Sequence, residues 1–314
     1  MTAILIIAIV IIFNFINLSM KKYVFLAVIA LLAASCSKET MNEVTNPEQP
    51  TAPVTVRVSN LSISQEDLPD GSTRAAQTIE SYDNVGAIDL AFYAGETEVF
   101  KTTQLRSNPS TYTTFGEFSC NLPIGSYTMV VVGRGCGNDD VFVLTSPTAA
   151  SYTSERARET FCATQSVTVT AAGADVSVTM NRIIALLNIR STDAASEGMA
   201  TIRTTYAAGG KSFNPTTGLA TSNAGFVVTN SRHVVDGKLN VGNYVFLATD
   251  EQTMTITIEV LDADDNVLLT RVVPNVPLKR NRKTILSGDI FTASASTTAF
   301  QVETSWLEDN TVNI

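Results

Sequence analysis

The chain has 314 residues, of which 45% are hydrophobic and only 16% are charged, and its formal net charge is −9. This composition excludes a disordered polyelectrolyte, and it argues against nucleic acid as a partner, because phosphate contacts need a basic surface. The sequence holds one histidine, which removes most Ser-His-Asp, Cys-His and multi-histidine metal arrangements.

The N-terminal region predicts export. From Met20 the chain has two lysines, an apolar run over residues 24–32 and small residues up to Ser35, which is the order of a secretory signal. We therefore expect residues 1–35 to be a signal region whose true start is Met20. The alternative is one longer signal anchor over residues 4–34.

The end of this signal, from Leu32 to Cys36, resembles a bacterial lipobox, although its leucine stands one place earlier than usual. The resemblance implies that the Cys36 thiol is acylated, with palmitate among the lipids, and that the mature protein is a lipoprotein of the outer membrane. A multiply acylated cysteine anchors a protein firmly. The next residues, Ser37-Lys38-Glu39, look like the surface-export signal of Bacteroides-type lipoproteins or, alternatively, like the start of a polar linker.

Residues 36–53 are polar and contain three prolines and no aromatic residue, which predicts a lipidated flexible tether. With Cys36 acylated, the cysteines that remain are Cys120, Cys136 and Cys162. They allow at most one disulfide, or they serve as small buried hydrophobic residues. No C-x-x-C spacing occurs, so we expect no metal site.

Alternation of apolar and polar residues dominates the rest of the chain. Such runs cover residues 54–63, 254–260 and 300–306, and each predicts a strand that buries one face. The apolar positions of the first run are Val54, Val56, Val58, Leu61 and Ile63. The positions that share one face of the last run are Phe300, Val302, Thr304 and Trp306.

Two other segments break this alternation. Residues 183–189 are almost wholly apolar, which predicts a strand covered on both faces or one that bridges two cores. Residues 153–161 favour a short helix. Gly, Asn, Asp and Pro separate the runs, and the fold class is all-β, with antiparallel β-sandwiches of a transthyretin-like or Greek-key kind.

The motif L-x-x-G-x-Y occurs twice, with its glycines at Gly125 and Gly242, and an apolar run follows each copy. Two copies at domain-length separation predict two sandwiches of similar build. We expect an N-terminal domain over residues 54–193 and a C-terminal domain over residues 194–314.

Motifs that carry chemistry are incomplete. Residues 208–212 end like a phosphate-binding loop, but Thr205 stands where its first glycine belongs. Residues 262–266 place three carboxylates on a predicted turn without the glycine and closing glutamate of a calcium-binding loop. The sequence therefore predicts no metal, no cofactor and no enzymatic activity.

Several features in order resemble the fimbrillin families of Bacteroidales, which include major and minor fimbrium subunits and their anchor and tip relatives. These features are the surface-type lipoprotein signal, the tether and first strand, the stretch around Arg74, the L-P-x-G-x-Y motif and the basic segment of residues 276–289. The resemblance spans roughly residues 20–305.

The resemblance implies assembly by proteolysis and strand exchange. An arginine-specific surface protease would cut between Arg74 and Ala75, within the kind of polar loop where proteolysis concentrates. The cut would release the lipid anchor and the first strand, and a strand from another fimbrial subunit would take its place. The donor implied is the C-terminal run of residues 299–306, or that run is simply the last strand of its own domain.

The function expected from the sequence is that of a structural and adhesive fimbrial subunit at the cell surface. The alternatives are a non-polymerising anchor or tip component and a glycan-binding surface lipoprotein, which would need exposed aromatic platforms. A hydrolase on a β-scaffold is a third alternative, and it would need a pocket with convergent acidic residues.

Overall fold

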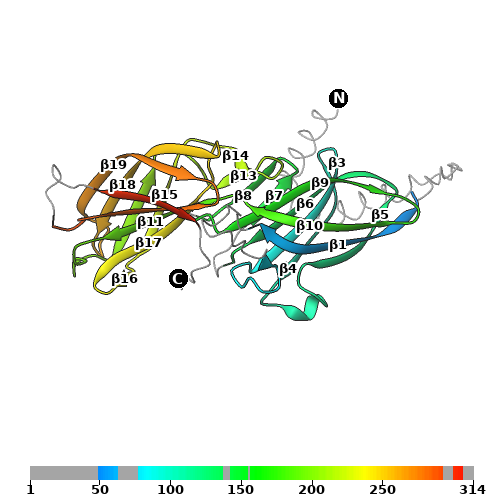
Figure 1. Cartoon of the computed structure of the whole chain (residues 1–314), viewed down its shortest axis with the longest axis horizontal. Helices are drawn as coiled ribbons and strands as arrows, with labels where there is room; N and C mark the ends of the chain where they lie inside the picture. The colour runs from blue at the N-terminus through cyan, green and yellow to red at the C-terminus, as the bar shows by residue number, and fades with distance from the viewer. Residues whose placement is uncertain (1–48, 63–76, 137–141, 155, 293–299, 307–314) are drawn as a thin grey trace, which may run out of the picture. The chain divides into compact units, whose positions relative to one another are not determined.

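Alternating apolar and polar residues form strands through most of the described chain. The structure is a computed structural model, and it describes residues 49–62, 77–136, 142–154, 156–292 and 300–306. The one helix in these ranges is a 3-10 turn, η1 (Pro109–Thr111). The prediction of an all-β fold is confirmed (Figure 1).

An eight-stranded sheet surrounds the first core, in the order β2-β1-β10-β9-β6-β3-β4, with β5 also paired to β1. Its strands are β1 (Thr51–Ser62), β2 (Gln77–Thr78), β3 (Ala87–Ala94), β4 (Thr97–Leu105), β5 (Glu117–Pro123), β6 (Gly125–Arg134), β9 (Thr160–Val169) and β10 (Ala174–Arg182). β9 and β10 pair only at Cys162–Asn181 and Phe161–Arg182. The sheet therefore turns a corner there, and the core lies between its two halves.

Two further sheets enclose the second core. One has the order β16-β17-β11-β20-β21 and the other has the order β15-β12-β18-β19. The strands of the first are β11 (Ala185–Ser191), β16 (Val234–Val235), β17 (Lys238–Val245), β20 (Arg282–Gly288) and β21 (Gln301–Trp306). The strands of the second are β12 (Thr201–Tyr206), β15 (Phe226–Ser231), β18 (Glu251–Leu261) and β19 (Val267–Lys279).

A four-stranded sheet in the order β14-β13-β8-β7 joins a third apolar cluster. Its strands are β7 (Phe142–Ser146), β8 (Ala149–Tyr152), β13 (Ser212–Asn214) and β14 (Leu219–Ala220). The rings of Phe213 and Phe246 stack with their centroids 4.6 Å apart in this cluster, which also contains Ile183 and Ile184. Such aromatic contacts add to the free energy gained by burial.

Two strand pairs depart from the antiparallel arrangement that the sequence predicts. β1 runs parallel to β10, and β11 runs parallel to β20, while the other pairs are antiparallel. Both parallel pairs join strands far apart in the sequence, because parallel neighbours need a long crossover connection.

The expected helix over residues 153–161 is wrong for the residues that the structure describes there. Ala157 forms a β-bridge with Tyr244, Glu159 is buried, and β9 begins at Thr160. These tertiary contacts outweigh the helix propensity of the segment.

The apolar segment after Arg182 connects two cores, as expected. Ile183 and Ile184 lie in the third cluster, while β11 is buried between β17 and β20 in the second core. The change of core therefore occurs before β11 and earlier than residue 193. The division into domains 54–193 and 194–314 stays a prediction.

The two copies of L-x-x-G-x-Y are not structurally equivalent. Gly125 begins β6, and the Tyr127 hydroxyl donates a hydrogen bond of 2.7 Å to the Pro123 carbonyl. Gly242 lies inside β17, where it pairs with Asn188 instead of preceding a strand. The repeat therefore marks a similar sequence in two different local settings.

The three described cysteines form no disulfide with one another. Cys162 is buried, and burial raises its pKa to about 12. Cys120 is half-buried and Cys136 is exposed. The interpretation as buried hydrophobic residues therefore fits Cys162 and does not fit Cys136.

Candidate assembly site

β1 lies between two other strands. It pairs in parallel with β10 from Val54 to Ser62 and antiparallel with β5 from Thr51 to Arg57. β2 adds a short antiparallel pairing at Asn60 and Leu61. Both backbone edges of β1 are therefore hydrogen-bonded, and β1 is a central strand (Figure 1).

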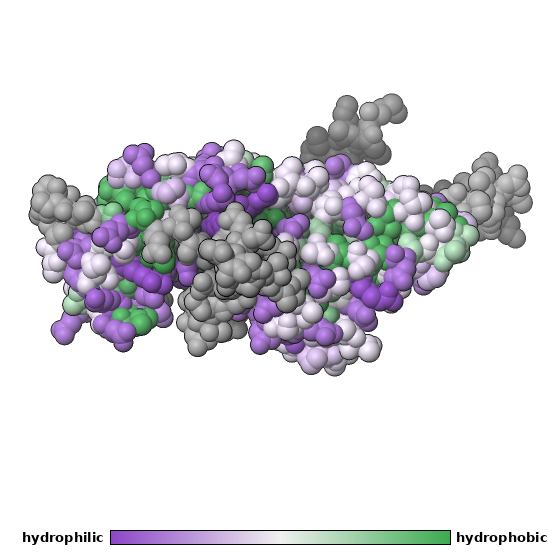
Figure 2. All heavy atoms as spheres, in the orientation of Figure 1, coloured by the Kyte–Doolittle hydropathy of each residue, from purple (hydrophilic) through white to green (hydrophobic). Residues whose placement is uncertain are grey.

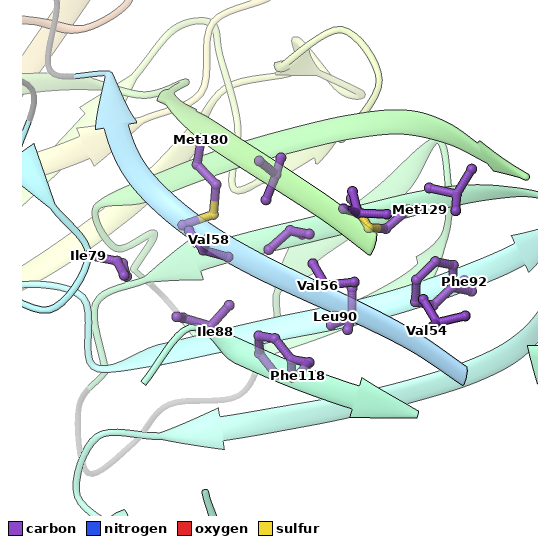
Figure 3. Packing of buried hydrophobic residues seen from close by; sticks show 14 of the residues in the cluster. Val54, Val56, Val58, Ile79, Ile88, Leu90, Phe92, Phe118, Met129 and Met180 are labelled. Carbon is purple, nitrogen blue, oxygen red and sulfur yellow. The ribbon is translucent and has the colours of Figure 1, made fainter. Parts of the chain in front are cut away.

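Alternation gives β1 one fully buried face. The inward residues are at most 4% exposed: Ala52, Val54, Val56, Val58 and Leu61. A bulge between Val58 and Asn60 shifts the register by one residue and keeps Leu61 inward. Figure 3 shows Val54, Val56 and Val58 among side chains from other strands, such as Leu90, Phe92 and Met129.

The turn before β10 approaches β1 so closely that only glycine fits. Gly173 has φ +90°, and a Cβ added there would lie 2.2 Å from the Pro53 carbonyl oxygen. A side chain would meet both backbone strain and a clash. The backbone of this turn therefore packs directly on the start of β1.

The outer face of β1 carries an ion pair to each neighbour. The Arg57 Nη1 lies 2.6 Å from Asp175 Oδ1 on β10, and its Nε lies 3.5 Å from Glu117 Oε1 on β5. One cation therefore bridges three strands. All three side chains are exposed, so each pair adds little to stability by itself.

Several sequence-predicted residues lie outside the described residues: Cys36, Ile63, Arg74 and Ala75. Arg74 falls in the segment of residues 63–76, which connects β1 to β2. Lipidation and cleavage therefore stay predictions.

The candidate donor residues form an edge strand. β21 pairs with β20 along residues 301–306, and no second partner for it occurs among the described residues. Phe300 is half-buried against the second core, whereas Val302 is 42% exposed. Thr304 and Trp306 pair with Thr284 and Arg282. β21 thus occupies a different sheet from β1, and the two candidate strands are not brought together within the chain.

Asp193 holds the segment that leads towards β21. Its carboxylate accepts hydrogen bonds from the backbone N–H groups of Ile290, Phe291 and Thr292 and from the Thr292 hydroxyl. Partial burial alone would raise the pKa of Asp193, but these hydrogen bonds hold it below its ordinary value. The ionised form therefore fixes this connection.

We expect Asp193→Asn to lower the melting temperature by roughly 2–5 °C at pH 7. Because the folded-state pKa of Asp193 is lowered, its contribution is present above the unfolded-state pKa and is lost as pH falls through the folded value. Thermal unfolding should therefore show a smaller difference in melting temperature between the variant and the wild type at pH 3 than at pH 7. Asp264→Asn, in the exposed turn after β18, is the control and should change little. An equal lowering of the melting temperature at pH 7 and at pH 3 would contradict this role of the ionised Asp193 carboxylate.

A buried charged network joins the first core to the second. Arg182 Nη2 lies 2.8 Å from Glu159 Oε1 and donates a hydrogen bond of 2.8 Å to the Tyr82 hydroxyl, which itself donates one to Glu159. Arg182 Nη1 also donates to Asn281 Oδ1 in the turn between β19 and β20. Burial is the main reason that the pKa of Tyr82 is raised. Arg182 therefore connects three segments that are distant in the sequence.

A polar recess of about 810 Å³ opens where β9 and β10 diverge. Its lining includes Thr164, Ser177 and Thr179, together with the ion-paired Glu251 and Lys279. The described aromatic side chains are all buried or half-buried. The exposed platform that glycan binding would need is thus not found among them, and glycan binding stays an alternative.

Exposed apolar side chains occur on several strands, with three of them on β19. Figure 2 shows hydrophobic residues in separate areas among hydrophilic ones on the face that it draws. The exposed large apolar residues are Val99, Leu105, Val143, Val227, Val235, Val267, Leu268, Val272 and Val302. Scattered residues of this kind are normal for a protein surface.

Two structural features are absent from the described residues. No group of three or more His, Cys, Asp or Glu side chains there is arranged to hold a metal ion. No helix in that part of the chain has the length and apolarity to cross a bilayer.

A family model described as "Family of unknown function (DUF6562)" matches residues 50–313. The chain belongs to this family. The DUF6562 match begins at the start of β1 and includes both cores and β21. No curated protein matches the chain.

Solved structures similar to this DUF6562 chain come from Bacteroidales. An adhesin candidate from Bacteroides ovatus has 9% identity and a TM-score of 0.49, covering 82% of this chain and 96% of its own. The fimbrial anchor protein Mfa2 from Porphyromonas gingivalis has 9% identity and a TM-score of 0.41, covering 82% and 98%. The tip fimbrial protein Mfa3 from the same organism, truncated at its C-terminus, has 11% identity and a TM-score of 0.39, covering 82% and 100%. These are proteins of the kinds that the sequence resemblance names.

The inward face of β1 follows from the sequence pattern, but the groups that hold this strand in place do not. Arg57, Asp175 and Glu117 look like ordinary surface charges in sequence, since Arg57 and Asp175 are 118 positions apart. Asp193 likewise stands 97 to 99 positions from its partners. No local pattern marks such contacts.

Proposed function

We propose that this chain is a non-enzymatic fimbrial subunit of the cell surface, exported as a lipoprotein and active in adhesion through assembly with other subunits. One observation carries the proposal: β1 is a central strand with a fully buried apolar face, and the segment that follows it contains Arg74. Cleavage there would separate β1 from the rest of the sheet.

Loss of β1 would leave a gap that only another strand fills well. The facing edges of β10 and β5 would lose their backbone partners, and the core would lose the side chains of Val54, Val56, Val58 and Leu61. Burial of donor side chains at four such apolar positions contributes about 6–12 kcal/mol to binding, before the entropy lost in ordering the donor strand is subtracted. Addition of a strand from another subunit restores both the hydrogen bonds and the apolar contacts.

The proposed donor is β21. It is an edge strand, so its release breaks pairing on one side only, and its apolar residues alternate as a donor requires. A subunit of this kind would have an acceptor site around β1 and a donor strand at its C-terminal end.

We expect Arg74→Ala to abolish conversion to a shorter form by an arginine-specific protease. N-terminal sequencing of protein recovered from the cell surface would read Ala75 for the wild-type chain and a blocked or upstream end for the variant. Arg57→Ala, in the hydrogen-bonded β1, is the control and should leave processing intact. Normal conversion of Arg74→Ala would reject this cleavage site.

The lipid anchor has its own test. Cys36→Ala should move the protein from the membrane fraction to the soluble fraction, because the acylated thiol is the proposed attachment. Fractionation followed by immunoblotting measures this, with Cys136→Ala as the matched cysteine control. A Cys36→Ala variant that stays in the membrane fraction would contradict the lipoprotein proposal.

A further inference from the structure

The outer face of β1 adds a charge requirement to the acceptor site. Arg57 stands directly opposite Glu117 on β5 and bonds to Asp175 on β10. Among the described residues, Arg57 is the one cation that forms an ion pair with either carboxylate. Removal of β1 would therefore leave two carboxylates facing the gap without their cation.

The proposed donor strand of a second copy, β21, does not meet this requirement. Residues 284–314 contain no lysine or arginine, so a donor strand from these residues brings no cation in any register. When Phe300, Val302 and Thr304 face inward, the outward residues are Gln301, Glu303 and Ser305. Glu303 would then add a third carboxylate to this face, where like charges on neighbouring strands repel.

We propose that the strand which replaces β1 carries lysine or arginine at the Arg57 position and comes from a different polypeptide. This inference rests on the proposed strand exchange. The partner is an extended segment with apolar residues at alternate positions and one basic residue between two of them. The apolar residues supply affinity, while the basic residue supplies selectivity against a second copy of this chain.

The size of this selectivity follows from the exposure of the charges. Arg57 and Glu117 are both 48% exposed, and Asp175 is 70% exposed. Cross-strand charge pairs of this kind are individually weak. Exchanging two attractive contacts for two repulsive ones is expected to change affinity by about tenfold.

The test uses the full chain with residues 72–75 replaced by the recognition sequence of a sequence-specific protease. After cleavage, labelled peptides compete for the acceptor site, and fluorescence anisotropy gives their affinities. The probes are the peptide of residues 51–62, its Arg57→Glu form, the peptide of residues 299–306 and its Glu303→Lys form. We expect Arg57→Glu to weaken binding about tenfold and Glu303→Lys to strengthen binding by a similar factor.

The matched protein is the Glu117→Gln/Asp175→Asn variant, whose substitutions lie on the exposed face. On this variant, the difference in affinity within each peptide pair should fall below about twofold. Two results would overturn the inference without contradicting strand exchange. In the first, the two peptides of each pair bind the unmodified protein with equal affinity. In the second, their affinities still differ on the variant. Failure of the unaltered 51–62 peptide to bind would instead overturn strand exchange, and the inference with it.

Discussion

Replacing Arg182 by alanine is expected to lower the free energy of unfolding by about 3–5 kcal/mol. The Arg182 side chain is 0% exposed, and that of its partner Glu159 is 5% exposed. The substitution leaves the Glu159 carboxylate buried without its cation and removes the contact with the Phe161 ring, whose centroid lies 4.9 Å from the guanidinium carbon. Urea denaturation followed by circular dichroism measures the loss.

The control is Arg203→Ala, which removes an ion pair with Glu259 whose side chains are 35% and 22% exposed. Solvent screens that pair, so its loss should cost about 1 kcal/mol or less. The double variant Arg182→Met/Glu159→Gln should recover part of the lost stability, because it removes both buried charges. A cost for Arg182→Ala no larger than that for Arg203→Ala would show that the network is structurally dispensable.

Removing residues 299–314 is expected to abolish donation of β21 to another fimbrial subunit, and with it assembly, while both cores remain folded. Among the described residues, β21 pairs with β20 and with no second strand, and Phe300, which precedes β21, packs against the second core. The loss of stability should therefore be small compared with the loss of the donor. Electron microscopy and size-exclusion chromatography measure assembly, and thermal unfolding checks the fold.

A point variant separates donation from folding. Val302 is 42% exposed in its own sheet but would be buried as a donor residue, so Val302→Lys should block assembly and leave the melting temperature nearly unchanged. Val272→Lys, at a residue that is 61% exposed on edge strand β19, is the matched control and should assemble normally. Polymers formed by the truncated chain would rule out the C-terminal donor.

The strands were predictable wherever burial repeats locally. The alternation of Val54, Val56 and Val58 predicts β1 and its inward face, because successive side chains of a strand point to opposite sides. The same argument holds for β18 and for the position of β21. The fold class follows from such local patterns.

Features that depend on distant residues were not predictable in this way. The parallel pairing of β1 with β10 requires knowing which strand lies alongside, and no residue of either strand specifies it. The helix expected over residues 153–161 failed because the burial of Glu159 depends on Arg182, which lies beyond the segment. Charged residues have the same local appearance whether they end on a surface or in a core.

The place of β1 at the beginning of the described chain has a consequence for the order of folding. β3, β6 and β9 are neighbours in the sheet and pair antiparallel, so they can associate while β1 still waits for β10, whose paired residues lie 119 or 120 positions away in the sequence. Closing so long a loop is slow, and contacts of this separation form late. β1 is thus expected to be among the last strands to dock, and the folding chain then passes through a stage in which the edges of β10 and β5 that β1 covers are still unpaired.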